Sequence, residues 1–155
     1  MLGLESNLRA HQELAHKLCF EVTETSAVAN LHFASDFMRE MKRLNCRFAL
    51  DDFGTGLSSY AYLQKLPVDF VKIDGIFVKD MATNLTNYAM VRSINELCHF
   101  LDLQTIAEYV EDMEIMDTLK EIQVDYAQGF AIAKPRRLDS LGTGTSTNPV
   151  YAYKK

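Results

Sequence analysis

The chain has 155 residues, of which 48% are hydrophobic, and its formal net charge is −5. This length is enough for one domain with a substantial core. No apolar run approaches the roughly 20 residues that a membrane-spanning helix needs, and the N-terminus lacks the apolar core of a signal peptide. The acidic balance argues against binding to the backbone of nucleic-acid polymers. These properties predict a cytoplasmic globular protein with no membrane contact in this segment.

Apolar runs and amphipathic patterns alternate along the chain. In chain order, they predict helix 4–16, strand 18–24, helix 26–44, strand 47–52, helix 59–66, strand 69–74, helix 88–101, strand 103–110, helix 112–122 and strand 124–131. Thr25 or Ser26 is expected to cap the second helix. Each of the three cysteines lies in or beside an apolar segment, without CxxC spacing, so we expect buried, reduced thiols.

Short apolar strands separated by helices predict an α/β fold with a parallel sheet. Repeats of this size are typical of a TIM-like (β/α) barrel or of a doubly wound sheet. A closed barrel needs about eight strands and roughly 250 residues, whereas five strands are predicted here. Residues 1–138 are therefore expected to form either an open sheet or a part of a barrel. Residues 139–155 are polar, lack an apolar period and are predicted to be a disordered tail.

The most informative stretch runs from Phe48 to Gly56, where an apolar strand ends in the adjacent carboxylates Asp51 and Asp52. Two neighbouring acids repel each other and are costly to desolvate. A divalent cation such as Mg²⁺ or Mn²⁺ offsets that cost, because it prefers hard oxygen ligands. The alternative is a solvated turn in which Asp52 or Ser58 caps the next helix.

Similar polar groups stand at the C-terminal end of every predicted strand. The set consists of Glu21 with Glu24, Asp51 with Asp52, Lys72 with Asp74, Glu108 with Glu111, and Gln128. In parallel α/β folds the C-terminal strand ends meet on one face, where sites are built. We therefore expect these side chains to converge on one site.

Structural roles remain open for single members of this set. Glu24 and Glu111 could favour the N-terminus of a following helix. Lys72 could extend its charge to solvent. Asp74 could cap a turn, and Gln128 could bond to nearby backbone groups.

Together the side chains fit phosphodiester hydrolysis. Two cations held by the carboxylates would clamp phosphate oxygens and lower the pKa of a bound water. Lys72 would stabilise charge on the phosphate or orient the attacking water. A carboxylate near the metals would accept the proton of that water.

Five ordered motifs resemble those of the EAL-domain cyclic-di-GMP phosphodiesterases. They are Glu21-Val-Thr-Glu24, Asp51-Asp-Phe-Gly-Thr-Gly56, Lys72-Ile-Asp74, Ala107-Glu108-x-Val-Glu111 and Gln128-Gly129. The resemblance extends from about Leu18 to Pro135. It implies a (β/α) barrel that binds Mg²⁺ or Mn²⁺ and opens cyclic di-GMP to linear pGpG.

The resemblance also implies roles for single residues. The metal ligands would be Glu21, Asp51, Asp52 and Glu108. Lys72 matches the lysine beside the catalytic water, and Glu108 also matches the general base. The substrate-binding or supporting positions would be Glu24, Asp74, Glu111 and Gln128, with Glu24 holding the loop after Asp51-Asp52. A homodimer, paired through the segment after Asp52, is implied as well.

The sequence departs from the family pattern in three places. The Glu-Ala-Leu signature, with its metal-binding Glu and phosphate-binding Arg, does not occur in the chain. The metal-ligand Asn of the family would lie upstream of Glu21, at a position before Met1, so it does not occur in this sequence. Tyr109 stands where the family usually has glycine. The chain resembles the C-terminal two-thirds of an EAL domain, with about three strands absent. Two functions therefore stay open: an impaired phosphodiesterase, or an inactive module that senses the nucleotide or binds proteins.

Overall fold

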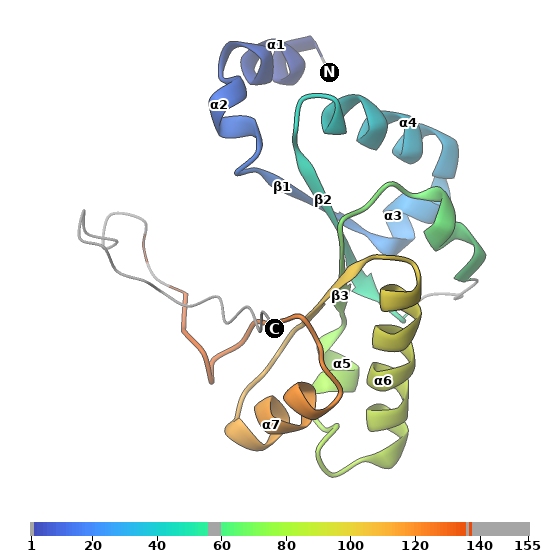
Figure 1. The fold of residues 1–155 in the computed structure, drawn as a ribbon, viewed down its shortest axis with the longest axis vertical. Helices are drawn as coiled ribbons and strands as arrows, with labels where there is room; N and C mark the ends of the chain where they lie inside the picture. Colours follow the sequence, from blue (N-terminus) through green and yellow to red (C-terminus); the bar gives the residue numbers. More distant parts are fainter. Residues whose placement is uncertain (1, 56–59, 136, 138–155) are drawn as a thin grey trace. The chain divides into compact units, whose positions relative to one another are not determined.

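A computed structural model gives the fold of the chain (Figure 1). The structure describes residues 2–55, 60–135 and 137, so the tail predicted at 139–155 lies outside the described residues. The chain divides into two compact units, Met1–Lys72 and Ile73–Lys155, with the boundary inside the third strand.

The first unit contains two strands, most of a third, and the helices between them. Its elements are α1 (Leu2–Ala10), α2 (Gln12–Ala15), β1 (Cys19–Thr23), α3 (Glu24–Ala29), α4 (Leu31–Lys42), β2 (Arg47–Phe53), the 3₁₀ helix η1 (Tyr60–Lys65) and β3 (Phe70–Ile73). β1 runs parallel to β2, with Cys19 opposite Arg47 and Thr23 opposite Asp51. β2 also neighbours β3. Phe48, Leu50 and Phe53 of β2 have no exposed surface, so this strand carries the core of the unit.

The second unit continues the alternation of strands and helices. Its elements are α5 (Gly75–Val78), α6 (Leu85–Phe100), β4 (Gln104–Ala107), α7 (Met113–Glu121) and β5 (Tyr126–Ala127). β4 runs parallel to β5, with Ile106 opposite Tyr126. On the other side of β4, the Glu108 amide donates to the Ile73 carbonyl at 3.3 Å. The predicted α/β class and its five strands are confirmed.

Two predicted helices are each split in the structure. His11 leaves the helical region (φ −131°, ψ 46°) between α1 and α2. Asn30 does the same (φ −145°, ψ 72°), and its side chain accepts a hydrogen bond from the Phe33 amide at 3.2 Å, so that it caps α4. The cap of α3 is Thr23, not Thr25 or Ser26, because the Thr23 hydroxyl oxygen accepts from the Ser26 amide. Local side-chain capping therefore overrides the apolar period.

Other element boundaries also shift. α6 begins at Leu85 because the Asn84 side chain accepts from the amides of Thr86 and Asn87. The four-residue α5 was not predicted, because a single turn is too short to show an apolar period. β5 is much shorter than the predicted 124–131, since the chain turns at Gly129, whose carbonyl accepts from the Ile132 amide at 3.0 Å.

The turns that lead into β2 and β4 have the same geometry. Asn45 and Asp102 take left-handed backbone conformations, with φ of 66° and 57°. In the next position, the Cys46 amide donates to the Met41 carbonyl at 3.2 Å, and the Leu103 amide donates to the Cys98 carbonyl at 2.9 Å. This pattern satisfies the last carbonyls of a helix. It ends α4 and α6 at equivalent points before each strand.

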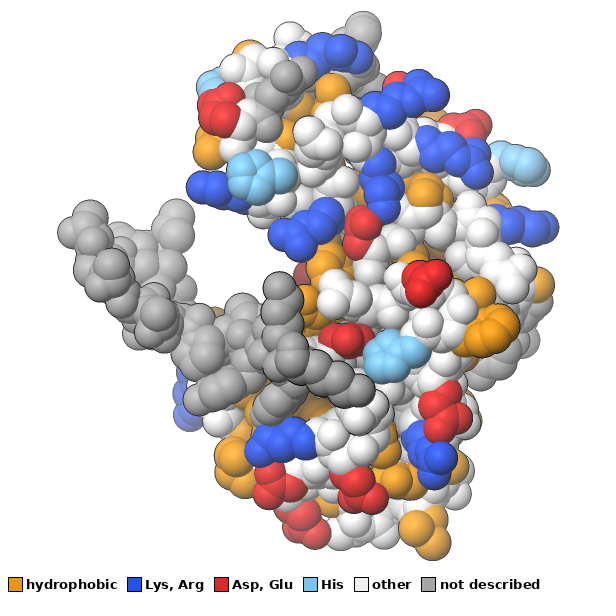
Figure 2. Space-filling view, viewed as in Figure 1, with side chains coloured by type: hydrophobic (Ala, Val, Ile, Leu, Met, Phe, Trp, Pro, Cys, Tyr) orange, Lys and Arg blue, Asp and Glu red, His pale blue; other side chains and the backbone are white. Residues whose placement is uncertain are grey.

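The three cysteines are free thiols. Cys46 and Cys98 are buried as expected, and burial raises the pKa of the Cys98 thiol to about 12. Cys19 is exposed at the start of β1, which corrects the expectation of three buried thiols. No helix among the described residues is long and apolar enough to cross a membrane. Figure 2 shows acidic and basic side chains interspersed with apolar ones on one face.

Candidate functional site

Asp51 and Asp52 lie at the C-terminal end of β2, after three buried strand residues. Asp52 has a left-handed backbone (φ 56°), and its amide donates to the Asp51 carboxylate at 3.1 Å. A β-strand alternates its side chains between two faces, and the left-handed turn breaks this alternation at Asp52. The two adjacent carboxylates therefore stand where the regular strand ends.

Lys72 joins the ends of β1, β2 and β3 inside the first unit. Its ammonium lies 2.9 Å from the Glu21 carboxylate and 2.9 Å from the Asp51 carboxylate. The Lys72 side chain is only 5% exposed, whereas that of Glu21 is 54% exposed. Burial of a charge requires close partners. The ion pairs therefore fix Lys72 at the base of the site and leave Glu21 open to solvent.

Glu24 holds the loop that follows Asp52. It is 3% exposed, and its carboxylate accepts hydrogen bonds from the Gly54 amide at 3.0 Å and from the Tyr62 hydroxyl. Gly54 has φ of 105°, a conformation that glycine adopts without steric cost. The sequence did not identify Tyr62 as a partner, because nothing local connects a tyrosine of η1 with an acid of α3.

The donors of the first unit suit a hard cation. Glu21 and Asp51 pair with the Lys72 ammonium, and Asp52 follows Asp51 at the end of β2, so three carboxylates lie at these strand ends. Mg²⁺ and Mn²⁺ prefer such oxygen ligands, and their charge offsets the repulsion between neighbouring acids. The residues that are present therefore fit a divalent cation.

In the second unit, the predicted residues that follow β4 and β5 share one cavity of about 270 Å³. Its walls are formed by Glu108, Tyr109, Glu111, Gln128, Gly129 and Phe130. Asp74 is not among these lining residues, and its side chain accepts from the Ile76 amide at 2.8 Å and caps α5. Of the alternatives considered for Asp74, capping is the one that the hydrogen bond supports.

Gly129 fixes the backbone beside this cavity. A Cβ atom at this position would stand 2.2 Å from the Val110 carbonyl oxygen and 2.4 Å from the Val110 nitrogen. The Gln128 backbone continues the pairing beyond β5, because its amide donates to the Ala107 carbonyl at 2.8 Å and its carbonyl accepts from Val110. The Gln-Gly pair in the sequence signals this close approach, which only a residue without a side chain permits.

Tyr109, which stands where the family usually has glycine, has a backbone conformation that glycine prefers. Its φ of 53° is left-handed, the region in which glycine is at ease and a side chain is strained. The ring packs on Gly75, where an added Cβ would stand 2.2 Å from the Tyr109 Cδ2 atom. The residue is nevertheless 63% exposed. A bulky side chain is thus kept at a position suited to glycine.

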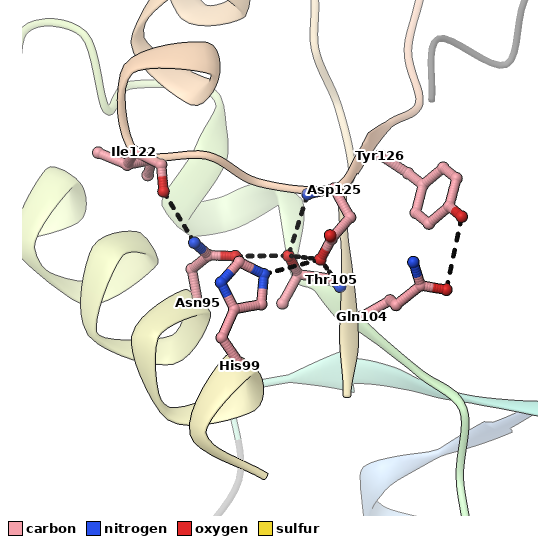
Figure 3. A network of polar contacts seen from close by, with 7 residues as sticks. All are labelled: Asn95, His99, Gln104, Thr105, Ile122, Asp125 and Tyr126. Atoms are coloured by element: carbon pink, nitrogen blue, oxygen red, sulfur yellow. Dashed lines mark hydrogen bonds and ion pairs between the residues drawn. The ribbon is translucent and has the colours of Figure 1, made fainter. Parts of the chain in front are cut away.

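A separate polar network lies at the N-terminal ends of β4 and β5 (Figure 3). Asp125 accepts from the Thr105 amide at 2.8 Å and lies 2.8 Å from the His99 ring. The Thr105 hydroxyl contacts the Asn95 side chain at 2.5 Å, and Asn95 donates to the Ile122 carbonyl. In parallel α/β barrels, side chains at the N-terminal end of the strands contribute to stability, whereas the chemistry is carried at the C-terminal end. This network was not predicted from the sequence.

The first unit also has an aspartate before a strand that accepts a hydrogen bond from a backbone amide of the neighbouring strand. Asp69, directly before β3, accepts from the Phe48 amide at 2.9 Å and pairs with Lys42 at the end of α4. Asp69 and Asp125 both follow a buried valine and precede an aromatic residue, in Val68-Asp69-Phe70 and Val124-Asp125-Tyr126. This repeated tripeptide is the sequence signal from which both contacts could have been found.

A family model described as EAL domain matches residues 3–135. Cyclic di-GMP phosphodiesterase PdeB of Shewanella oneidensis is 50% identical over 123 residues, which are 79% of this chain and 14% of that protein. Cyclic di-GMP phosphodiesterase PdeF of Escherichia coli is 40% identical over 131 residues, which are 84% of this chain and 18% of that protein. The chain spans less than a fifth of the length of these curated relatives.

Solved structures show the same likeness. The PaMucR phosphodiesterase in complex with c-di-GMP has a TM-score of 0.81 and 30% identity, covering 88% of this chain and 55% of that one. The EAL domain of FimX from Pseudomonas aeruginosa, bound to c-di-GMP, has a TM-score of 0.79 and 28% identity, covering 85% and 54%. The chain therefore spans little more than half of these two chains.

Proposed function

Because the chain belongs to the EAL domain family, we propose that it hydrolyses cyclic di-GMP to linear pGpG by metal-assisted phosphodiester hydrolysis. The observation that supports this most is the arrangement of Glu21, Asp51 and Lys72, which join three strand ends through two ion pairs of 2.9 Å. The identity to proteins named as cyclic di-GMP phosphodiesterases supports the choice of substrate.

The proposed cofactor is Mg²⁺ or Mn²⁺, held by Glu21, Asp51, Asp52 and Glu108. When bound, such a cation polarises phosphate oxygens and lowers the pKa of bound water. The fit rests on the hard carboxylate donors of the first unit, and the part of Glu108 rests on the family resemblance.

Lys72 has two tasks in this proposal. Its buried ammonium orients the Glu21 and Asp51 carboxylates, and it stabilises the negative charge that develops on the phosphate. Glu24 keeps the loop after Asp52 in place through Gly54. Glu108 accepts the proton of the attacking water. Glu111 and Gln128 line the cavity of the second unit and contact the substrate.

The test is chromatographic detection of pGpG after incubation of the purified chain with cyclic di-GMP and Mn²⁺. We expect Lys72→Met and Glu108→Gln to lower the rate by about 100-fold or more, the scale of losing a group that acts on the reacting centre. Lys65→Met, which removes an exposed lysine of η1, is the matched control and should keep the parent rate. Equal rates for Lys72→Met and Lys65→Met would contradict the assigned role.

We further propose that the 155 residues alone turn over slowly, because the Glu-Ala-Leu signature does not occur in them. A version extended with an upstream segment that carries this signature should be faster, since metal ligands position water and phosphorus. Equal rates for the two versions would show that the signature is dispensable. The resemblance alone also supports a cytoplasmic location and a homodimer, and sedimentation of the purified chain tests the latter.

The alternative function is an inactive EAL-like module that acts as a nucleotide sensor or protein-interaction domain. Calorimetry with cyclic di-GMP, combined with detection of pGpG in the extended version, separates the two functions. A sensor binds the nucleotide without forming pGpG, a protein-interaction domain does neither, and an enzyme forms the product.

A further inference from the structure

The cavity of the second unit has aromatic walls as well as acidic ones. Tyr109 and Phe130, which are 63% and 59% exposed, line it together with Glu108, Glu111, Gln128 and Gly129. Its volume of about 270 Å³ lies just below the range of roughly 300–1,000 Å³ that is typical of pockets for drug-sized ligands. The space therefore suits one planar ring system rather than a whole dinucleotide.

The backbone conformation of Tyr109 favours a functional role for its ring. A residue other than glycine with φ of 53° is strained, and strained residues cluster at ligand sites. The ring recovers little of this strain by burial, because it is mostly exposed. Its contact with Gly75 fixes the side of the ring that faces α5. An exposed, positioned ring beside a cavity is a stacking surface.

The first unit has an equivalent of Tyr109. In β2 the strand-end acid Asp51 is followed by left-handed Asp52, and after β4 the acid Glu108 is followed by left-handed Tyr109. The turns before the two strands are equivalent as well, as Asn45 and Asp102 show. The position after the strand-end acid therefore presents a carboxylate in one unit and an aromatic ring in the other.

We propose that Tyr109 is a ligand-contacting residue that stacks on the guanine base of a nucleotide. The choice of guanine rests on the proposed function. Guanine carries N–H donors on its edge, which match the carboxylates and the amide oxygen of the cavity. Lys134, whose ammonium lies 5.5 Å from the centre of the Phe130 ring, adds positive charge beside these walls and favours a phosphate-bearing ligand.

The test is calorimetric titration of the purified chain with guanosine 5′-monophosphate in the presence of Mn²⁺. This monoester has no internucleotide bond, so the measurement does not depend on hydrolysis. We expect Tyr109→Leu to weaken binding at least about fivefold, the lower end of the loss caused by removing a stacked aromatic ring. Tyr109→Trp should bind as tightly as the parent and, in a chain without tryptophan, should report the base through its fluorescence.

Three controls separate contact from structure. Phe100→Leu removes an aromatic residue that is 83% exposed at the end of α6, and it should leave the affinity unchanged. Ribose 5-phosphate lacks the base, so its affinity should not respond to Tyr109→Leu. Tyr109→Gly removes the backbone strain, so it should unfold at the same or a higher temperature than the parent and still bind the nucleotide more weakly.

The outcomes also separate this proposal from the proposed function. If guanosine 5′-monophosphate does not bind, or if Tyr109→Leu binds it as tightly as the parent, the stacking role is overturned, whether or not cyclic di-GMP is hydrolysed. If Tyr109→Leu weakens binding and no pGpG is formed under any condition, the stacking role stands and the phosphodiesterase assignment falls.

Discussion

The two units carry the same backbone plan with different side chains at the strand ends. In each unit a left-handed residue lies between a helix and the next strand, and an acid at or just after the end of that strand is followed by a second left-handed residue. In each unit an aspartate before the next strand accepts the amide of the second residue of the preceding strand. The left-handed turns and the aspartate-to-amide hydrogen bonds, which stabilise the fold, therefore recur in both units.

The differences fall where chemistry is expected. Asp52 of the first unit corresponds to Tyr109 of the second, and Lys72 corresponds to Gln128. Lys72 is buried against two carboxylates, whereas Gln128 is exposed at a cavity wall. The first unit thus has a buried ammonium between two carboxylates at its strand ends, whereas the second has an exposed amide and aromatic rings beside its acidic side chains. Two units with similar backbone geometry can therefore carry different side chains at the C-terminal ends of their strands.

The largest expected effect is loss of the first unit through Leu50→Asp. Leu50 has no exposed surface and lies in the strand that carries Asp51 and Asp52. A buried, unpaired carboxylate costs on the order of 4 kcal/mol or more, so we expect no cooperative thermal transition in circular dichroism. Phe33→Asp, at a site that is 59% exposed on α4, is the control and should unfold near the parent's midpoint. A parent-like transition for Leu50→Asp would show that β2 is not central.

The next effect concerns the repeated aspartates. Asp125→Ala should lower the free energy of unfolding by about 2–4 kcal/mol, because the buried Thr105 loses the acceptor of its amide. Asp69→Ala should cost about 1–3 kcal/mol through the Phe48 amide. Urea titration measures both.

The matched control for these variants is Asp117→Ala, whose side chain is 69% exposed in a pair with Lys120. Such surface pairs contribute about 0–1 kcal/mol. If Asp125→Ala were no more destabilising than Asp117→Ala, the network of Figure 3 would not support the second unit, and the parallel with Asp69 would fail.

An effect of the same size as that of Asp69→Ala tests the fit between Gly75 and Tyr109. Gly75→Ala places a Cβ 2.2 Å from the Tyr109 ring, so we expect a loss of about 1–3 kcal/mol in the free energy of unfolding. The same change in a Tyr109→Gly background should be nearly neutral, because the obstructing ring is gone. A double-mutant cycle gives the coupling energy.

Gly129→Ala introduces a similar steric clash, but this clash cannot be removed by changing Tyr109. Its Cβ would meet the Val110 backbone rather than a side chain, so Tyr109→Gly should not rescue it. Additive effects of Gly75→Ala and Tyr109→Gly would mean that the ring moves away freely, which would also weaken the argument that it is held as a stacking surface.

Much of the site was readable in the sequence because its signals are local. The alternation of apolar strands and helices predicted the α/β class, and the acids after each apolar run predicted the strand ends. The rule that parallel strands end on one face predicted that Lys72, Glu21 and Asp51 would lie on the same face, whereas their ion pairs were not predicted. Element boundaries were less accurate, since single side chains such as Asn30 and Asn84 set them by capping.

Tertiary structure decided the contacts between residues that are distant in the sequence. The bond of Glu24 to Gly54 and Tyr62, the acceptor role of Asp125 and the close approach of Gly129 to Val110 depend on how elements pack. The sequence by itself determined which residues are charged, apolar or flexible at each strand end, because periodicity is a property of neighbours. Only the folded chain decided which of these groups satisfy one another, because desolvated polar groups choose their partners by proximity in space.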